Sequence, residues 1–375
     1  MAIRSPGLAG SRLIEAATAA GGIAKLVGAG RDRLRSLGLA AETIEALKSP
    51  DTAGIEADLE WLDAKGHHLV CWDDEVYPAL LRRIPSPPAA LFVDGDPDVL
   101  WQPQVAVIGS RNPTAGGLEH ARAFSAELGR AGMTVTSGLA SGIDSAAHEA
   151  ALDCGAYTVA VCGTGPDTIY PAASRRLAER IRERGALVTE FPTGHPPRRA
   201  HFPARNRIIS GLSLGVLVIE AGLNSGTLIT ARQAGEQGRE VFALPGSLHN
   251  PMVKGCHRLI REGARLVETV QDVLAELSPL AGELAGALRA EMEESAPDGA
   301  AEKRIPADAG LLQDPEYRTL WDALEHDPRT VAELVEITGF PVRAVSSMLL
   351  MLDLQGKVEV HSSGRYSRVN VRARS

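Results

Sequence analysis

The sequence predicts an α/β protein with a doubly wound, mainly parallel sheet at its centre. Short apolar segments alternate with helical stretches from Gln104 to about residue 277. Most of these segments are apolar without interruption, which is typical of parallel strands that helices cover on both faces. Glycines and serines gather in the turns after the segments, where sheets of this class bind their ligands.

A helical domain is predicted before the sheet, at residues 1–85. Residues 8–65 are rich in Ala, Leu and Gly and suit short helices such as Ala41–Lys48. We therefore expect a helical, SAM-like accessory domain, and a small helical DNA-binding module is the alternative. Three prolines within residues 85–88 then interrupt regular structure.

Seven strands are predicted in the sheet domain, which we place at residues 86–278. Helical stretches separate them, so neighbouring strands run parallel and their carboxyl ends meet at one edge of the sheet. The predicted strands are Val105–Ile108, Thr134–Thr136, Thr158–Val161, Leu187–Thr189, Val216–Ile219, Val241–Leu244 and Arg265–Val267.

A linker and a small C-terminal domain complete the predicted organisation. Residues 279–312 hold few large apolar side chains and predict a linker. Within residues 313–370, Thr330 and Glu333 have the spacing of a capping box at a helix start. Three helices and a hairpin, typical of a winged helix, are expected at Glu316–Leu324, Thr330–Thr338, Val342–Leu354, Lys357–Val360 and Tyr366–Val369, with residues 362–364 as the turn.

Composition limits the class of protein. The 375 residues include 39 Lys and Arg against 47 Asp and Glu, a formal net charge of −8. No segment approaches the ~18 apolar residues of a membrane helix, and residues 1–6 lack the apolar core of a signal peptide. The four widely spaced cysteines argue against a disulfide framework and a zinc site. We expect a cytoplasmic protein that needs no membrane, metal or cofactor.

Positive charge is concentrated in one stretch. From Pro171 to Gly211 there are nine arginines, three glutamates and no aspartate, a formal +6, which leaves −14 for the rest of the chain. Such a patch suits a polyanionic partner. A solvated, arginine-rich helix face is the alternative.

Several turns after predicted strands could hold an anion. Ser110 and Arg111 follow the first strand in a turn that lacks both the dinucleotide fingerprint and the ATPase phosphate loop. The alternative is that Ser110 and Asn112 are only turn residues. Amide-rich turns of this kind let a phosphate approach the backbone closely. The other candidates are Gly138, Ser141 and Gly142 after the second strand, and Ser225, Gly226 and Thr227 after the fifth.

No arrangement of residues predicts catalysis, and we expect a protein that is not an enzyme. Asp144 and His148 share a helix face, but a cap and an interior hydrogen bond suit them better than a catalytic dyad. Glu220 is expected to orient an arginine or cap a turn rather than act as an acid or base. Tyr170 and Phe202 suit base stacking and core packing equally well.

Seven ordered blocks between residues 88 and 277 resemble the DNA-processing protein A family, also called DprA or Smf. The blocks are Gly109–Arg111, Ser137–Asp144 with Ala147 and His148, Tyr170 and Pro171, Phe202–Ser213, Ser225–Thr230, Pro245 and Gly246, and Gly255–Ile260.

The resemblance implies an extended Rossmann-type domain that binds single-stranded DNA. It also implies a homodimer that protects incoming DNA in natural transformation and loads a RecA-type recombinase onto it. By position, Arg111, Arg205 and Arg207 would contact DNA phosphates, with Ser110, Ser141 and Asn206 in support. Members often carry a lysine directly after the Tyr-Pro pair; here that place holds Ala172, and Arg175 and Arg176 are expected to supply the charge.

Phosphate contacts predict a definite salt dependence. Each phosphate that the protein neutralises on a single strand contributes about −0.7 to the slope of log affinity against log salt. Replacing Arg205 and Arg207 with alanine is expected to flatten that slope and to leave the fold intact.

Two other functions remain open at this stage. A phosphoribohydrolase-like nucleotide-processing enzyme would share the Rossmann-type core, although its Pro-Gly-Gly turn is missing from Ala221–Thr227. A transcription regulator would need the winged helix to bind duplex DNA. Residues 316–375 hold eight basic and eight acidic residues, so a protein contact or an auxiliary DNA contact through Lys357, Arg365 and Arg368 is expected instead.

Overall fold

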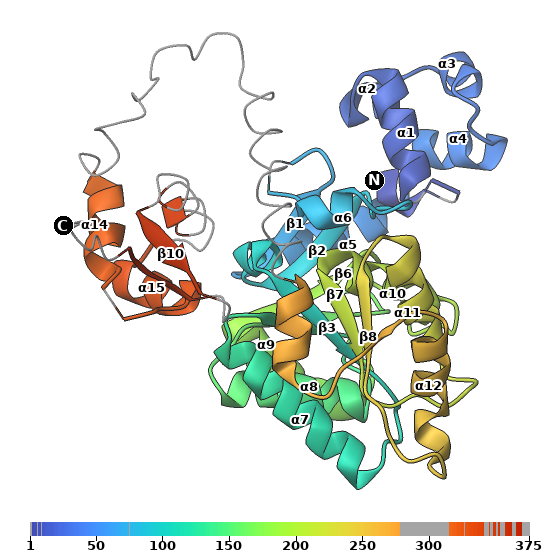
Figure 1. The fold of residues 1–375 in the computed structure, drawn as a ribbon. Coiled ribbons are helices and arrows are strands. Elements are labelled where there is room, and N and C mark those ends of the chain that lie inside the picture. The colour runs from blue at the N-terminus through green and yellow to red at the C-terminus, as the bar shows by residue number, and fades with distance from the viewer. Residues whose placement is uncertain are drawn as a thin grey trace.

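The computed structural model describes most of the chain outside residues 278–314. The described residues are 2–5, 7–8, 10–74, 76–277, 315–325, 327–340, 345, 348–349, 352, 357–361 and 365–369. Among them no helix is long and apolar enough to cross a membrane. Figure 1 shows a helical N-terminal part, a large central sheet and a small C-terminal part.

A nine-stranded sheet forms the centre of the molecule, in the order β1-β2-β6-β5-β4-β3-β7-β8-β9. Strands β3 to β9 are parallel, and β1 and β2 extend one edge in antiparallel pairing. All seven predicted strands are confirmed, within two residues at each end. The strands are β1 His67–Cys71, β2 Ala90–Gly95, β3 Gln104–Ile108, β4 Thr134–Ser137, β5 Thr158–Val161, β6 Gly185–Thr189, β7 Gly215–Val218, β8 Glu240–Ala243 and β9 Arg265–Leu266.

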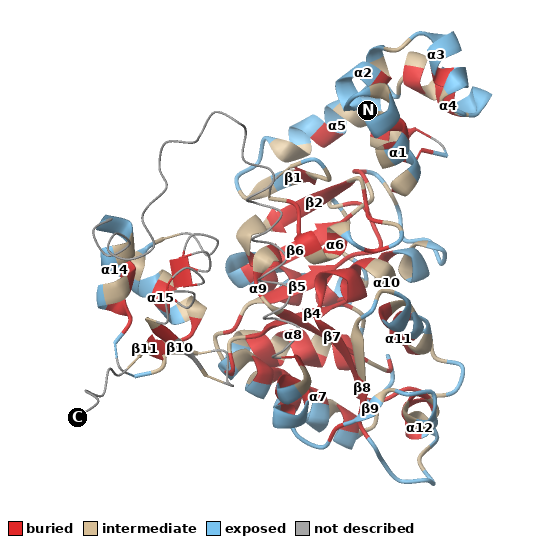
Figure 2. Cartoon of the chain, turned by 45° about the horizontal axis from the view of Figure 1, so that its top comes forward, coloured by how far each residue is buried: buried red, intermediate tan, exposed pale blue. Residues whose placement is uncertain are grey.

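Helices cover both faces of this sheet, as the apolar strands require. Alternate residues of a strand point to opposite faces, so Val105 and Val107 of β3 belong to one core and Ala106 and Ile108 to the other. One face carries α7 Ala115–Arg130, α8 Ile143–Asp153, α9 Arg175–Arg184 and a helical segment at 270–277. The other face carries α6 Ala79–Arg82, α10 His201–Leu212, α11 Thr227–Glu236 and α12 Lys254–Arg261. Figure 2 shows the buried strands enclosed by helices with exposed outer faces.

The N-terminal part is helical, as predicted, but the sheet begins earlier than expected. β1 pairs with β2 from His67 opposite Asp94 to Cys71 opposite Ala90. A division after residue 85 therefore separates two paired strands, and a boundary near residue 66 fits the pairing better. The N-terminal helices are α1 Ser11–Ala20, α2 Ile23–Gly28, α3 Arg31–Ser36, α4 Ala41–Lys48 and α5 Thr52–Leu62.

The C-terminal part has a winged-helix pattern in the residues described. Thr330 and Glu333 form the predicted capping box, with each side chain bonded to the other's backbone N–H. The predicted linker and most of the predicted third helix lie outside the described residues. The elements are α14 Pro315–Ala323, α15 Val331–Thr338, β10 Val358–Val360 and β11 Tyr366–Arg368. Short 3-10 turns elsewhere are η1 Ala2–Arg4, η2 Pro97–Trp101, η3 Ala172–Ser174 and η4 Pro251–Val253.

Candidate nucleic-acid interface

The candidate site residues follow the carboxyl ends of parallel strands, so the topology gathers most of them at one edge of the sheet. The helices after β3 and β7, which are α7 and α11, cover opposite faces. Adjacent strands whose helices leave in opposite directions form the switch point where doubly wound sheets usually bind a ligand.

In this protein the switch point is filled by the chain's own side chains. Glu220 is buried and accepts hydrogen bonds from Thr114 N at 2.9 Å and Thr114 Oγ1 at 2.6 Å. Its carboxylate therefore occupies the amino end of α7, where an anion would otherwise bind. This confirms the structural role predicted for Glu220 and leaves that helix end unsuited to a phosphate.

The turn at Ser225, Gly226 and Thr227 is likewise bonded internally. Thr227 Oγ1 donates to the Gly109 carbonyl oxygen at 3.0 Å, and Ser225 Oγ accepts from Thr227 N at 3.2 Å. The amide groups of Leu228 and Ile229 donate to Ser225 and Gly226 carbonyls. The turn that was predicted to hold an anion thus joins the start of α11 to the end of β3, and within it Gly226 is exposed.

Asp144 and His148 are both buried and play structural parts. Asp144 accepts from Gly138 N at 3.2 Å and Ala140 N at 3.4 Å, which braces the turn after β4. Thr158 Oγ1 donates to the Val135 carbonyl oxygen, so His148 Nδ1 donates to Thr158 Oγ1 at 2.6 Å. Burial lowers the pKa of His148 to about 3, and the ring is neutral. The interior hydrogen bond predicted for His148 is confirmed, but Asp144 does not cap α8, whose N-cap Gly142 has no side-chain bond; it holds the preceding turn instead.

Ser110, Ser141 and Gly142 lie where the turns after β3 and β4 meet. Gly142 has a φ of 85°, and a Cβ there would collide with the carbonyl oxygens of Ser110 and Arg111. Ile143 N donates to Ser110 O at 3.1 Å, and Ser110 Oγ accepts from Asn112 N at 3.1 Å. These contacts fix the direction in which Arg111 leaves the sheet. Ser141 is exposed beside them.

Arg205 departs from the expected phosphate contact. Its side chain is buried, with the residue 4% exposed, and Nη1 donates to the carbonyl oxygens of Gly138, at 2.7 Å, and Val161. Nε donates to Asn206 Oδ1 at 3.0 Å. Burial lowers the pKa of Arg205, and nearby Asp144 opposes that shift. Arg205 therefore links the ends of β4 and β5 through their backbone carbonyl groups. We expected its removal to leave the fold intact, but these bonds indicate that its removal will destabilise the fold.

Arg207 also departs from the prediction, because its guanidinium is paired with a carboxylate of the protein and lies on another side of α10 from Arg205. Residues two apart on a helix point about 200° apart, and Arg207 Nη2 meets Glu190 Oε2 at 2.6 Å, where both side chains are largely buried. Gln237 Nε2 donates to the Arg207 carbonyl oxygen at 3.1 Å. Arg207 links α10 to the end of β6, so of the three arginines predicted to contact phosphates only Arg111 is both exposed and without an ion pair among the described residues.

Much of the arginine run is engaged in ion pairs, and the remainder is exposed. Arg180 pairs with Asp153, Arg182 with Asp94 and Arg184 with Glu336, in addition to the Arg207 pair. Apart from the buried Arg205, the arginines of the run that have no ion pair within the described chain are Arg175, Arg176, Arg198 and Arg199, and these four and Arg111 are exposed. Arg175 and Arg176 begin α9 after β5, and Arg198 and Arg199 precede α10 after β6, so all follow carboxyl strand ends.

An aromatic pair adjoins Arg111. The ring centroids of Tyr170 and Phe202 are 5.5 Å apart, and the Arg111 guanidinium carbon lies 5.5 Å from the Phe202 centroid. Tyr170 is 47% exposed and Phe202 is half-buried. The pair thus has an exposed part that a base could stack upon and an inner part packed against Gly163.

Sequence reasoning missed the segment at residues 191–200. Phe191 stacks on His201 with centroids 4.1 Å apart, beside His195 at 6.2 Å. Arg198 and Arg199 belong to the charge run, but the sequence motifs do not predict them as site residues. Their position just before the Phe202 block, without a nearby acidic partner in sequence, was the available signal.

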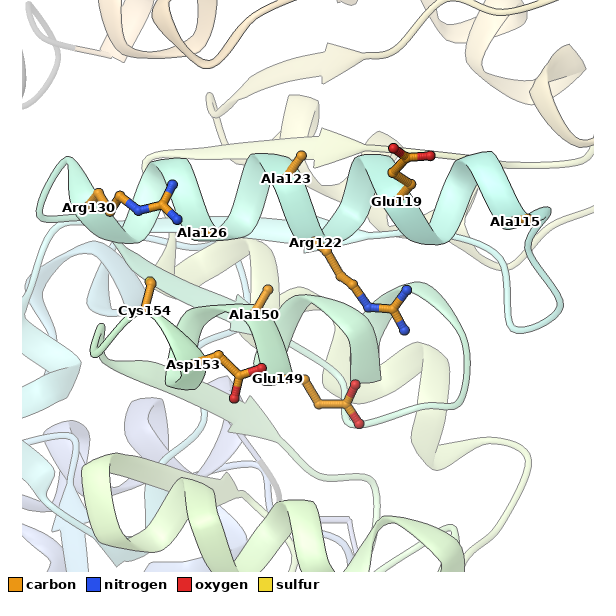
Figure 3. A pocket seen from close by; sticks show the side chains of 10 residues that line it. All are labelled: Ala115, Glu119, Arg122, Ala123, Ala126, Arg130, Glu149, Ala150, Asp153 and Cys154. Atoms are coloured by element: carbon orange, nitrogen blue, oxygen red, sulfur yellow. The ribbon is translucent and has the colours of Figure 1, made fainter.

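A separate hollow of about 710 Å³ lies between α7 and α8 (Figure 3). It carries two arginines and three carboxylates, so its charge does not favour a polyanion. The lining residues are Ala115, Glu119, Arg122, Ala123, Ala126, Arg130, Glu149, Ala150, Asp153 and Cys154. Within the described part of the chain, no group of three His, Cys, Asp or Glu side chains could hold a metal ion.

The two wing arginines are bonded within the C-terminal part. Arg368 Nε donates to the Trp321 carbonyl oxygen at 3.0 Å, and its guanidinium carbon lies 4.8 Å from the Trp321 ring centroid. Arg365 Nη1 donates to the Pro328 carbonyl oxygen at 3.2 Å. These bonds hold both guanidinium groups within the C-terminal part, which disfavours the auxiliary DNA contact predicted through Lys357, Arg365 and Arg368.

Comparison with known proteins yields matches along most of the chain. Residues 68–278 match the family described as DNA recombination-mediator protein A, and residues 296–364 match the DprA winged helix domain. The chain is similar to Protein Smf of Escherichia coli, with 48% identity over 245 residues, which are 65% of this chain and 66% of that protein.

Two solved structures are similar to this fold. The X-ray structure of DNA processing protein A from Streptococcus pneumoniae has a TM-score of 0.65 and 38% identity, and the match covers 73% of this chain and 95% of that one. DNA processing protein A from Helicobacter pylori, described for its single-stranded DNA binding mode, has a TM-score of 0.50 and 30% identity, covering 55% of this chain and 94% of that one.

Proposed function

This chain belongs to the DNA recombination-mediator protein A family, and from that premise we propose that it binds single-stranded DNA during natural transformation. The observation that carries the proposal is the set of five exposed arginines, without an ion pair among the described residues, that follow the carboxyl ends of strands, with Arg111 beside the ring of Phe202. Guanidinium groups grip phosphates, and aromatic rings accept unstacked bases of any sequence.

A long polymer suits this surface better than a mononucleotide does. The five arginines come from the ends of three different strands, β3, β5 and β6, so successive phosphates are a better match than one phosphate. The usual nucleotide crevice between β3 and β7 holds Glu220 and Thr227 instead. A phosphoribohydrolase-like activity is therefore the less favoured function.

Single-stranded DNA also suits it better than duplex DNA. The expected contacts are to phosphates and to base faces, which are accessible in a single strand and stacked in a duplex. The neutral C-terminal domain, with Arg365 and Arg368 bonded internally, offers little to the phosphates of a major groove.

Salt-dependent fluorescence anisotropy tests the proposal. Five phosphate contacts predict a log–log slope of about −3.5 on a single strand, and each lost arginine reduces its magnitude by about 0.7. Arg111→Ala and the double variant Arg198→Ala/Arg199→Ala should show this reduction. Arg180→Ala is the matched control, because Arg180 lies in the same charge run but pairs with Asp153. Equal slopes for all variants, or tighter binding to duplex, would refute the proposal.

The proposal extends to a homodimer. Large apolar side chains remain exposed after β7, including Leu248 at 78% and Leu266 at 50%, and Leu266 belongs to the edge strand β9. A second copy would cover this surface, and two grooves on one strand would bind with avidity. Light scattering of Leu248→Asp should then report a monomer; a dimer that persists in this variant argues against this surface.

Loading of a RecA-type recombinase completes the proposal. Its support is the family itself, whose described role is recombination mediation. The test is filament growth by the recombinase on single-stranded DNA that is coated with single-strand-binding protein. This chain should shorten the lag, and Arg198→Ala/Arg199→Ala should restore it.

A further inference from the structure

The N-terminal part is bonded directly to the segment that carries Arg198 and Arg199. Arg4 Nε and Nη2 donate to the two carboxylate oxygens of Asp58 at 2.6 and 2.8 Å. Arg4 Nη2 also reaches Thr193, its carbonyl oxygen at 3.0 Å and its hydroxyl at 2.8 Å. Asp58 in turn accepts from Thr193 N at 3.0 Å and from Thr193 Oγ1 at 2.9 Å. Three distant parts of the sequence therefore share one hydrogen-bonded cluster.

The cluster of Arg4, Asp58 and Thr193 is buried and closely packed. The side chains of Arg4 and Asp58 are each only 10% exposed. A Cβ at Gly54 of α5 would collide with the Arg4 guanidinium, so glycine lets that group lie against the helix. Burial alone would raise the pKa of Asp58, but the hydrogen bonds from Arg4 and Thr193 outweigh burial and lower it. The carboxylate is thus held ionised in place.

The cluster fixes the first residues of the segment and leaves its arginines exposed. Thr193 is held by Asp58, Gly194 N donates to the carboxylate of Asp167 at 3.0 and 3.1 Å, and His195 O accepts from Gly165 N at 2.9 Å. Residues 196–200 follow these anchors and are exposed. The direction in which Arg198 and Arg199 leave the body of the protein is set at the anchors.

We propose that Arg4 and Asp58 are positioning residues, through which the N-terminal helical part holds Arg198 and Arg199 in place for DNA. This inference rests on the proposed function, because it assigns these residues to the same DNA-binding surface. Fixing two flexible side chains before binding reduces the entropy that is lost on association. The N-terminal helices then contribute to DNA affinity without contacting the strand.

Four variants test the inference by anisotropy on a single strand over a range of salt. Asp58→Ala should lower the magnitude of the log–log salt slope by up to about 1.4, the value for two phosphate contacts. It should also lower the affinity at 0.1 M salt by up to about 25-fold, because each phosphate contact raises affinity about fivefold at that concentration. Asp58→Asn keeps an acceptor for Thr193 N and should lose less. Arg31→Ala is the control, because its exposed pair with Glu45 lies in the same helical part. Arg198→Ala/Arg199→Ala gives the direct loss.

A combined variant separates positioning from general destabilisation. If Asp58 acts through the two arginines, adding Asp58→Ala to Arg198→Ala/Arg199→Ala should leave the slope unchanged. Hydrogen exchange of residues 191–200 should also rise in Asp58→Ala while that of β3 to β5 stays constant. A normal slope in Asp58→Ala, or equal losses with and without the arginines, would overturn the inference. If Arg198→Ala/Arg199→Ala itself binds normally, the proposed DNA site fails instead.

Discussion

Replacing the buried Arg205 with alanine should lower the stability of the fold, and any loss of DNA affinity should follow from that destabilisation rather than from a lost phosphate contact. Two backbone carbonyl groups, of Gly138 and Val161, would lose a charged donor, and such hydrogen bonds contribute about 1.5–3 kcal/mol each. Asp144 would also lose the nearby positive charge that favours its ionised form. Removal of one member of a buried charged group typically costs about 3–5 kcal/mol. We expect Arg205→Ala to lower the free energy of unfolding by about that amount.

Urea unfolding followed by circular dichroism measures this change. Arg199→Ala is the comparison, because an exposed substitution usually alters the free energy of unfolding by about 0.5 kcal/mol or less. Arg205→Lys should also destabilise, since one ammonium group cannot reproduce the planar guanidinium fork. If Arg205→Ala loses under about 1 kcal/mol and instead reduces the salt slope by about 0.7, the side chain acts on phosphate and the structural role is refuted.

Three further substitutions probe the turns at the carboxyl edge. Glu220→Ala removes the acceptor of Thr114 N and Oγ1 and should lower the free energy of unfolding by about 2 kcal/mol in urea; no change would show that the amino end of α7 does not need the carboxylate. Gly142→Ala places a Cβ against two carbonyl groups at a positive φ and should cost at least about 2 kcal/mol, with weaker DNA binding in anisotropy; wild-type behaviour would mean that the turns separate easily. His148 has a folded-state pKa of about 3 against 6.5 unfolded, so the unfolded state binds the extra proton between those values and stability falls as pH drops below about 6.5. Urea unfolding of His148→Gln should show a shallower pH dependence between pH 6.5 and 4 than the wild type, and parallel curves would contradict the assigned burial.

The sequence was sufficient for the parallel sheet, because continuous apolar strands and glycine-rich turns are local signals. Neither β1 nor β2 was predicted, since His67 and His68 interrupt the apolar pattern of β1 and its pairing with β2 spans a proline-rich break. The capping box at Thr330 was predictable because four consecutive residues determine it.

The candidate site was only partly predictable, because burial and pairing depend on distant residues. Arg205 and Arg199 look alike in the sequence, yet one lies beneath the turns after β4 and β5 and the other is exposed. Likewise, Arg207 forms an ion pair with Glu190, which lies seventeen residues earlier in the chain, after β6. A charge run thus indicates the region of an anion surface, and only tertiary structure shows which of its members remain available.

The antiparallel edge strand β1 has a practical consequence for shortened forms of this protein. A protein that begins at residue 86 would lose the strand that pairs with Leu91, Phe92 and Val93, all buried in the full chain. The unsatisfied amides and carbonyls of β2 would then invite edge-to-edge association between molecules. A shortened protein that keeps residues 67–71 preserves that pairing, whereas one cut at the prolines should precipitate or form ill-defined oligomers.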